Sequence, residues 1–219
     1  MPLFTLIAFD LDGTLIDSRR DIAESASEML VTYGRKPLPV DDVTAMVGEG
    51  ARLLVERTCR AAGLVDVPPD ALERYLEIYD RRLFNHTRPY PGVAAALTRL
   101  SMSATLVVLT NKPTRPAERL VAHFGFAPRL AAVIGGDGGW PRKPDPAALQ
   151  ALMARFVATA DTTCLVGDSW IDAVTADRAG VSFCFARYGF GARQSANGSI
   201  DEPTFVVDTP AQLVPSLLG

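Results

Sequence analysis

Apolar residues follow two patterns along this chain. Residues 3–9 form a mostly apolar run without helical spacing, which is typical of a strand buried on both faces of a parallel sheet. Over residues 18–33, apolar side chains recur every three or four positions, which predicts an amphipathic helix. Ser18 or Asp17 is a candidate N-cap of this helix, and Gly34 is a candidate end.

Helical and strand-like segments alternate through the second half of the chain. Such alternation gives a parallel sheet with helices on both faces, so we expect an α/β fold with a doubly wound, mostly parallel, Rossmann-like sheet. The predicted segments are helix 93–100, strand 105–109, helix 116–124, strand 131–134, helix 145–156, strand 164–166, helix 171–179, strand 181–186, strand 204–207 and helix 210–218.

Residues 17–88 interrupt this alternation. After the first helix, amphipathic segments at about 53–63 and 72–83 predict more helices and almost no strand. Two connecting strips, 16–18 and the proline-containing 88–92, are expected to act as hinges. We therefore predict an inserted helical domain over residues 17–88 and a core domain made of residues 1–16 and 89–219.

Two acidic residues, Asp10 and Asp12, directly follow the first predicted strand. Open α/β sheets place their active sites at the carboxyl ends of their strands. One acid could attack as a nucleophile while the other gives and takes a proton. Gly13 would let the backbone turn sharply after them, although Asp-Gly is also a common solvated turn.

Three later segments favour the chemical interpretation. Thr110 and Asp168 each close a strand-like run, and Lys143 lies in a loop just before a predicted helix. All should meet at one edge of the sheet. Acids, a hydroxyl and a lysine suit phosphoryl transfer with Mg²⁺, which prefers carboxylate and phosphate oxygens.

On these motifs the chain resembles the haloacid dehalogenase superfamily over nearly its whole length. Within that superfamily it is most similar to the phosphoglycolate phosphatases. The segments that carry the closer resemblance are 47–51, 87–93, 110–113 and 135–137. One position departs from the pattern: Glu49 stands between two glycines where Asn is expected, and it adds a negative charge near a site for anions.

The resemblance implies a role for each motif residue. Asp10 would be the nucleophile that forms an aspartyl-phosphate, and Asp12 would be the general acid and base. Thr110 and the Asn111 amide would hold the phosphate, and Lys143 would neutralise it. Mg²⁺ would be held by these acids: Asp10, Asp12 through its carbonyl, Asp168 and, behind them, Asp172. Asp172 could instead cap its own helix. The inserted domain would be the mobile cap of the family.

Other residues carry weaker expectations. Lys112 could bind substrate or line the rim, and Arg52 could meet a substrate carboxylate or be an exposed helix residue. Trp140 and Trp170 could wall the site, but ordinary packing is the better interpretation for each.

Rival reactions are ranked from the same residues. A dehalogenase needs no acid at Asp12, because halide leaves unprotonated. Sugar phosphomutases usually carry a cap histidine where this chain has Ile22. Phosphonate hydrolases need a cap lysine for a Schiff base, and the only cap lysine here, Lys36, stands beside Pro37 after a predicted helix end. A non-enzymatic module would have lost a catalytic group, and none of the motif residues is missing. We expect a hydrolase of phosphoric monoesters, with 2-phosphoglycolate as substrate. A phosphatase for another small ester (a sugar phosphate, a nucleotide or pyrophosphate) is the alternative, and a phosphomutase is a more distant one.

Composition and charge limit the kinds of partner and compartment that we expect for this protein. A net charge of −3 argues against binding to nucleic acid. No uninterrupted apolar stretch could span a bilayer, and three unclustered cysteines fit a reducing compartment. We therefore expect a cytoplasmic protein without a membrane partner, as a monomer or homodimer. Residues 189–197 are expected to form a surface loop.

Overall fold

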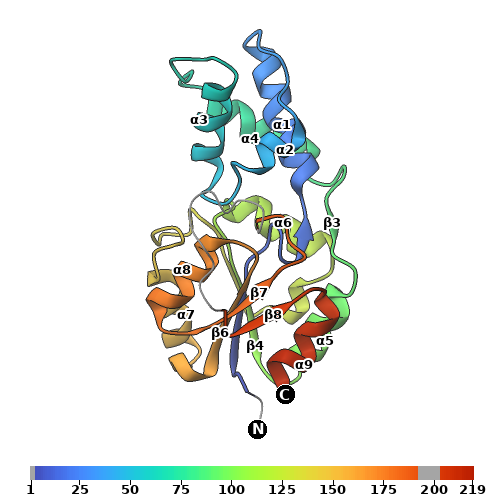
Figure 1. Ribbon diagram of the computed structural model, residues 1–219, viewed down its shortest axis with the longest axis vertical. Helices are drawn as coiled ribbons and strands as arrows, with labels where there is room; N and C mark the ends of the chain where they lie inside the picture. The colour runs from blue at the N-terminus through green and yellow to red at the C-terminus, as the bar shows by residue number, and fades with distance from the viewer. Residues whose placement is uncertain (1–2, 192–202) are drawn as a thin grey trace.

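A six-stranded sheet lies at the centre of the larger part of the molecule (Figure 1). The computed structural model describes residues 3–191 and 203–219. The strand order is β5-β4-β1-β6-β7-β8, and all neighbouring strands are parallel, so the expected doubly wound sheet is confirmed. The strands are β1 Leu6–Phe9, β4 Thr105–Leu109, β5 Ala132–Ile134, β6 Thr163–Gly167, β7 Ser182–Ala186 and β8 Phe205–Val207.

Both faces of this sheet are covered by helices. Leu6 and Ala8 of β1 pack toward α7 (Ala147–Arg155) and α8 (Trp170–Ala179). Ile7 and Phe9 point the opposite way, into the cluster that includes α5, α6 and α9. Those helices span Val93–Leu100, Thr114–His123 and Leu213–Leu218. Because alternate residues meet opposite apolar layers, the first strand reads as an apolar run without polar positions.

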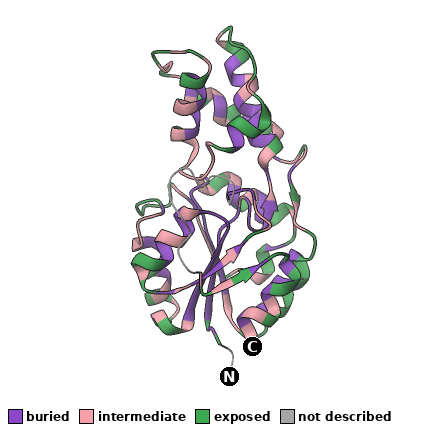
Figure 2. Cartoon of the chain, viewed as in Figure 1, coloured by how far each residue is buried: buried purple, intermediate pink, exposed green. Residues whose placement is uncertain are grey.

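Four helices stand beyond the carboxyl ends of the strands and pack on one another (Figures 1 and 2). They are α1 Arg19–Thr32, α2 Val40–Thr44, α3 Ala51–Ala61 and α4 Ala71–Arg82. Two short antiparallel strands, β2 (Ile16–Asp17) and β3 (Arg88–Pro89), run side by side where the chain enters and leaves this group. That pairing supports our proposal that residues 17–88 form a cap domain.

Several element boundaries differ from the sequence expectations. The short helix α2 was not predicted. Helix α6 begins at Thr114, before the expected start, because the Asp137 carboxylate accepts a hydrogen bond from the Thr114 N–H at 2.7 Å. Helix α7 begins later, at Ala147, whose N–H donates to Asp145 Oδ1 at 2.9 Å. The predicted closing helix is divided into a short 3-10 turn, Pro210–Gln212, and α9, which follows it. Among the described residues, Ala127–Arg129 and Ala160–Thr162 also form 3-10 turns.

The predicted surface loop at 189–197 needs a correction. Phe190 is buried, and the Gly191 N–H donates to Asp168 Oδ2 at 2.7 Å, so this part of the loop covers a motif residue. Residues 192–197 lie outside the described residues. Within the described chain, no helix is both long and apolar enough to cross a membrane.

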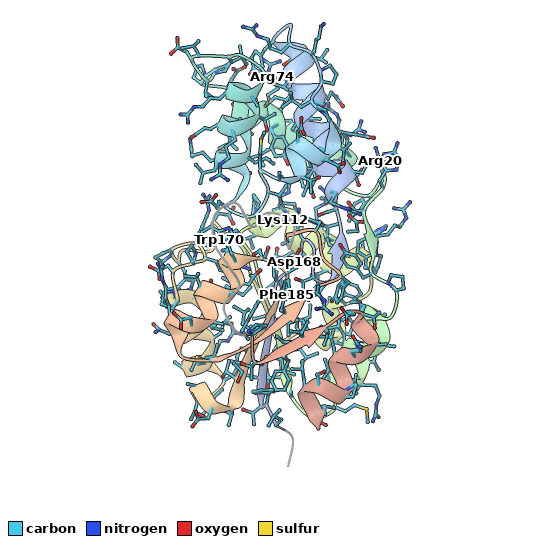
Figure 3. All side chains as sticks on the ribbon, in the orientation of Figure 1. Arg20, Arg74, Lys112, Asp168, Trp170 and Phe185 are labelled. Atoms are coloured by element: carbon cyan, nitrogen blue, oxygen red, sulfur yellow. The ribbon has the colours of Figure 1, made fainter. Side chains whose placement is uncertain are left out.

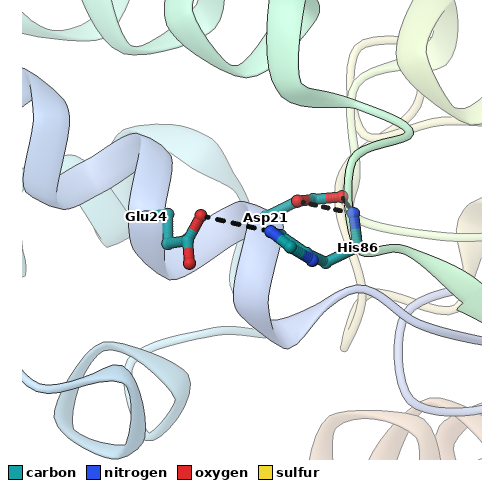
Figure 4. Close-up of side chains that lie close together, drawn as sticks. All are labelled: Asp21, Glu24 and His86. Atoms are coloured by element: carbon teal, nitrogen blue, oxygen red, sulfur yellow. Dashed lines mark hydrogen bonds and ion pairs between the residues drawn. The ribbon is translucent and has the colours of Figure 1, made fainter.

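A buried carboxylate fixes the start of α1 to the returning chain. Asp21 is fully buried, and it accepts hydrogen bonds from the His86 N–H at 2.9 Å, the Thr87 N–H at 2.8 Å and the Thr87 hydroxyl at 2.7 Å. The His86 ring also lies 3.7 Å from Glu24 (Figure 4). Because Asp21 and Thr87 are buried, the Asp21 carboxylate should contribute strongly to stability.

Replacing Asp21 with alanine should therefore lower the free energy of unfolding by about 3 kcal/mol, because it leaves several buried donors without an acceptor. Urea unfolding of the two proteins measures this difference. Asp66→Ala removes an exposed acid and is the matched control; it should change stability by less than about 0.5 kcal/mol. Equal unfolding midpoints for wild type and Asp21→Ala would show that the contact is not stabilising.

Candidate active site

Three adjacent strands bring the predicted motif residues together. Asp10 follows β1, Thr110 follows its neighbour β4, and Asp168 follows its other neighbour β6. All three side chains are buried. Figure 3 shows Asp168 and Lys112 where the sheet meets the four outer helices.

One cavity between the sheet and those helices is lined by nearly all the predicted site residues. Its walls also include parts of α1, α3 and α4 and the loop before α3. The lining residues are Asp10, Asp12, Ile22, Val47, Gly48, Gly50, Ala51, Leu54, Tyr75, Leu76, Tyr79, Thr110, Asn111, Lys112, Pro113, Lys143, Asp168, Ser169, Ile171, Asp172, Phe190 and Gly191.

Lys143 holds two acids at the floor of this cavity. Its Nζ lies 2.8 Å from Asp10 Oδ1 and 2.6 Å from Asp172 Oδ1, and all three side chains are buried. Burial alone would lower the pKa of Lys143, but Asp10 and Asp172 outweigh it and raise that pKa. Lys143 is therefore a fixed positive charge.

Asp172 caps its own helix, one of the two functions that the sequence left open, and it also contacts Lys143. One of its oxygens accepts from Lys143 Nζ. The other, Oδ2, accepts from the Ser169 hydroxyl at 2.6 Å and the Ser169 N–H at 3.2 Å, which completes a capping box at the start of α8. Because a carboxylate has two oxygens, it can cap its helix and orient the lysine together.

Neighbouring groups fix the position of Asp168 in the cavity wall. Its oxygens accept from the Gly191 N–H at 2.7 Å and the Thr14 hydroxyl at 3.4 Å. A Cβ on Gly13 would lie 2.0 Å from Asp168 Oδ2, and Gly13 has φ +94°, so only glycine fits this turn.

Negative charge is in excess at this point. Burial, with Asp10 and Asp172 nearby, raises the pKa of Asp168 well above its usual range. Burial also raises the pKa of Asp10 to about 6, even though Lys143 pulls it down. Burial is the largest cause of both shifts, and the neighbouring carboxylates add to it because three acids face a single lysine.

Asp12 is held by different partners. The Ser18 hydroxyl donates to Asp12 Oδ1 at 2.6 Å, and Lys112 Nζ lies 3.0 Å and 2.9 Å from the two carboxylate oxygens. Lys112 also lies 4.6 Å from the centre of the Tyr79 ring of α4. Lys112 is buried rather than at a rim, and Ser18 donates to Asp12 instead of capping α1.

Asn111 ties three segments together. Its side-chain amide donates to the carbonyls of Gly48 and Lys143, each at 2.9 Å, and its oxygen accepts from the Lys143 N–H at 2.9 Å. The side-chain amide of Asn111 is therefore already engaged, and its contact with a phosphate stays a prediction. The Thr110 hydroxyl faces the same cavity and accepts weakly from the Lys112 N–H at 3.3 Å.

Arg52 is not brought to the cavity. It is exposed on α3 and does not line the walls, so its contact with substrate stays a prediction. Glu49 forms an ion pair with Arg57, not with Arg52. Trp140 is 46% exposed, and neither Trp140 nor Trp170 lines the cavity.

Two groups of side chains among the described residues could hold a metal ion: Asp10, Asp168 and Asp172, and Asp21, Glu24 and His86. In the second group, Asp21 is already bonded by His86 and Thr87, and Glu24 forms ion pairs with Arg20 and Arg82. The first group has three buried acids and one lysine. Its all-oxygen donors and unbalanced charge fit Mg²⁺.

Comparisons with known proteins agree with this geometry. The model of the haloacid dehalogenase-like hydrolase family matches residues 7–186. A phosphoglycolate phosphatase of Caulobacter vibrioides is 37% identical over 188 residues, covering 84% of this chain and 79% of that protein. One from Pseudomonas fluorescens strain Pf0-1 is 37% identical over 220 residues, covering 97% and 79%. The crystal structure of a predicted phosphoglycolate phosphatase from Haemophilus somnus 129pt has a TM-score of 0.87, with 28% identity and 98% coverage of both chains.

If a divalent cation binds Asp168, Mg²⁺ should stabilise the folded protein. A concentration about tenfold above its dissociation constant should raise the melting temperature by roughly 3–6 °C, because it binds only the folded chain. Asp168→Asn should abolish this rise, and thermal melts with Mg²⁺ or EDTA measure it. Glu24→Gln alters the other group and should keep the full Mg²⁺-dependent rise. A rise that survives in Asp168→Asn would place the cation elsewhere.

Proposed function

Since the chain belongs to the haloacid dehalogenase-like hydrolases, we propose that it is a magnesium-dependent phosphatase that forms an aspartyl-phosphate and acts on 2-phosphoglycolate. One observation carries the reaction type: two acids at the end of one strand are held by two different lysines. Asp10 contacts Lys143, and Asp12 contacts Lys112. They can therefore perform separate tasks within one cavity.

Asp10 is the proposed nucleophile. Lys143 holds its Oδ1, which directs the carboxylate and leaves the other oxygen to attack phosphorus. The phosphoryl group moves to Asp10 as the bond to the leaving oxygen breaks. The Lys143 ammonium and the Thr110 hydroxyl would stabilise the oxygens of the transferring group.

Asp12 is the proposed proton carrier. It would protonate the leaving alkoxide and then take a proton from the water that hydrolyses the aspartyl-phosphate. Its carboxylate faces the same cavity as Asp10, and Ser18 and Lys112 fix its position. From this one position, Asp12 could serve both in forming the aspartyl-phosphate and in hydrolysing it.

Mg²⁺ would be held by the carboxylates of Asp10 and Asp168, by the carbonyl of Asp12, and by Asp172 behind them. It would supply positive charge for the phosphate, which otherwise would enter a site with an excess of acids. Asp168 keeps this position because Gly13, Thr14 and Gly191 pack around it.

With Mg²⁺ present, the purified protein should release inorganic phosphate from 2-phosphoglycolate. EDTA should abolish the release, and added Mg²⁺ should restore it. Asp10→Asn should lose turnover entirely, because the amide is not a nucleophile, whereas Asp177→Asn, an exposed change on α8, should match wild type. Phosphate release that persists in a metal-free sample would contradict the proposal. Preference for a different small ester would keep the phosphatase but replace the substrate.

Asp12→Ala should slow hydrolysis of an alkyl phosphate by roughly 10²–10⁴-fold, because the leaving alkoxide is no longer protonated. With p-nitrophenyl phosphate the first step should suffer much less, since that leaving group needs no proton. A pre-steady-state burst of p-nitrophenol followed by slow turnover is the expected signature, measured by stopped flow. Near-normal rates on the alkyl ester would remove Asp12 from the role of general acid.

A further inference from the structure

The cap side of the cavity offers few polar groups. The side chains that α1, α3, α4 and the loop before α3 contribute are apolar, apart from two tyrosines. The cationic side chains in the cavity, Lys112 and Lys143, are both paired with acids. The part of a substrate beyond its phosphate must therefore find its polar partner among a small set of groups.

The Tyr79 hydroxyl is one such group. Tyr79 lines the cavity from α4 and is only 3% exposed, and its hydroxyl has no hydrogen-bond partner among the described residues. A buried hydroxyl without a partner costs roughly 1–3 kcal/mol, and buried polar groups in proteins are rarely left so. The unpaired hydroxyl therefore destabilises the folded protein unless a ligand accepts its hydrogen bond.

The ring of Tyr79 is held in place. Lys112 Nζ lies 4.6 Å from its centroid, and the Tyr75 ring stacks on it at 5.8 Å with an interplanar angle of 4°. Burial, together with the Asp12 and Asp21 carboxylates, raises the pKa of Tyr79 well above its usual range. The hydroxyl thus keeps its proton and can donate it to an acceptor.

A second feature of the same wall also favours an anionic acceptor. Helix α3 has 11 residues and starts at Ala51. Its N-cap is Gly50, with φ +92°, and no N-cap side chain accepts a hydrogen bond from the first N–H groups of the helix. Gly50 and Ala51 both line the cavity. The first N–H groups of a helix carry a partial positive charge that favours a carboxylate nearby.

We propose that the Tyr79 hydroxyl determines specificity by donating a hydrogen bond to a carboxylate oxygen on the leaving group of the substrate. This inference rests on the proposed phosphatase function. It assigns recognition of the carboxylate to the α4 wall, beside the N-terminus of α3, rather than to the exposed Arg52.

The test compares two esters that share a two-carbon leaving group and differ in its end group. 2-Phosphoglycolate carries a carboxylate where ethyl phosphate carries a methyl group. Tyr79→Phe should lower kcat/KM for 2-phosphoglycolate by roughly 10- to 100-fold, through a higher KM, since a hydrogen bond to a charged group is lost. For ethyl phosphate the change should stay below about twofold. Tyr33→Phe, which removes a cap hydroxyl bonded to Asp70, is the matched control and should retain wild-type constants.

A thermal melt separates recognition from support of the fold. Because the hydroxyl has no partner, ligand-free Tyr79→Phe should melt no lower than wild type; a lower melting temperature would overturn the inference. Equal losses on both esters, no loss on either, or a selective loss in Arg52→Ala instead would also overturn it. So would a wild type that does not prefer 2-phosphoglycolate over ethyl phosphate. A wild type that hydrolyses neither ester with Mg²⁺ would instead refute the proposed function.

Discussion

The burial of three carboxylates around one lysine constrains the whole site. Asp10, Asp168 and Asp172 come from two adjacent strands and a helix start, and their oxygens lie within 4.8 Å of one another. Lys143 reaches two of them from a separate loop. Such a cluster is costly to bury unless further positive charge compensates it. A site built this way favours a divalent cation together with an anionic substrate, which agrees with phosphoryl transfer.

A second lysine connects this chemistry to the outer helices. Lys112 pairs with Asp12 and lies against the Tyr79 ring, while Ser18, at the start of α1, donates to the same carboxylate. Asn111 joins the loop before α3 to the loop of Lys143. Asp12, the proposed proton carrier, is therefore positioned by residues on both sides of the cavity, so a movement of α1 or α4 would change its surroundings.

The sequence predicts best what the sheet itself dictates. Asp10, Thr110 and Asp168 each end an apolar run, and parallel strands bring such ends to one edge, so their meeting was predictable. The cap formed by Asp172 was one of two foreseen roles, but its simultaneous contact with Lys143 was not foreseen, because it depends on the direction of each carboxylate oxygen. Partners chosen by side-chain rotamers were beyond prediction: Lys112 with Asp12, and Glu49 with Arg57. Periodicity predicted the amphipathic helix at about 72–83, but it carried no sign that the Tyr79 hydroxyl would lack a partner.

Under the proposed assignments, phosphate binding and substrate choice depend on different parts of the chain. The groups proposed to face a phosphate lie at strand ends and on short loops, where the parallel sheet sets the spacing of their backbones. The rest of a substrate meets helices whose inner faces also form their own packing, so one tyrosine can serve the helix core with its ring and a ligand with its hydroxyl. A single buried donor discriminates strongly, because a substrate without the matching acceptor leaves that donor unpaired. Relatives with the same motifs can thus differ in substrate through changes on α3 and α4 alone.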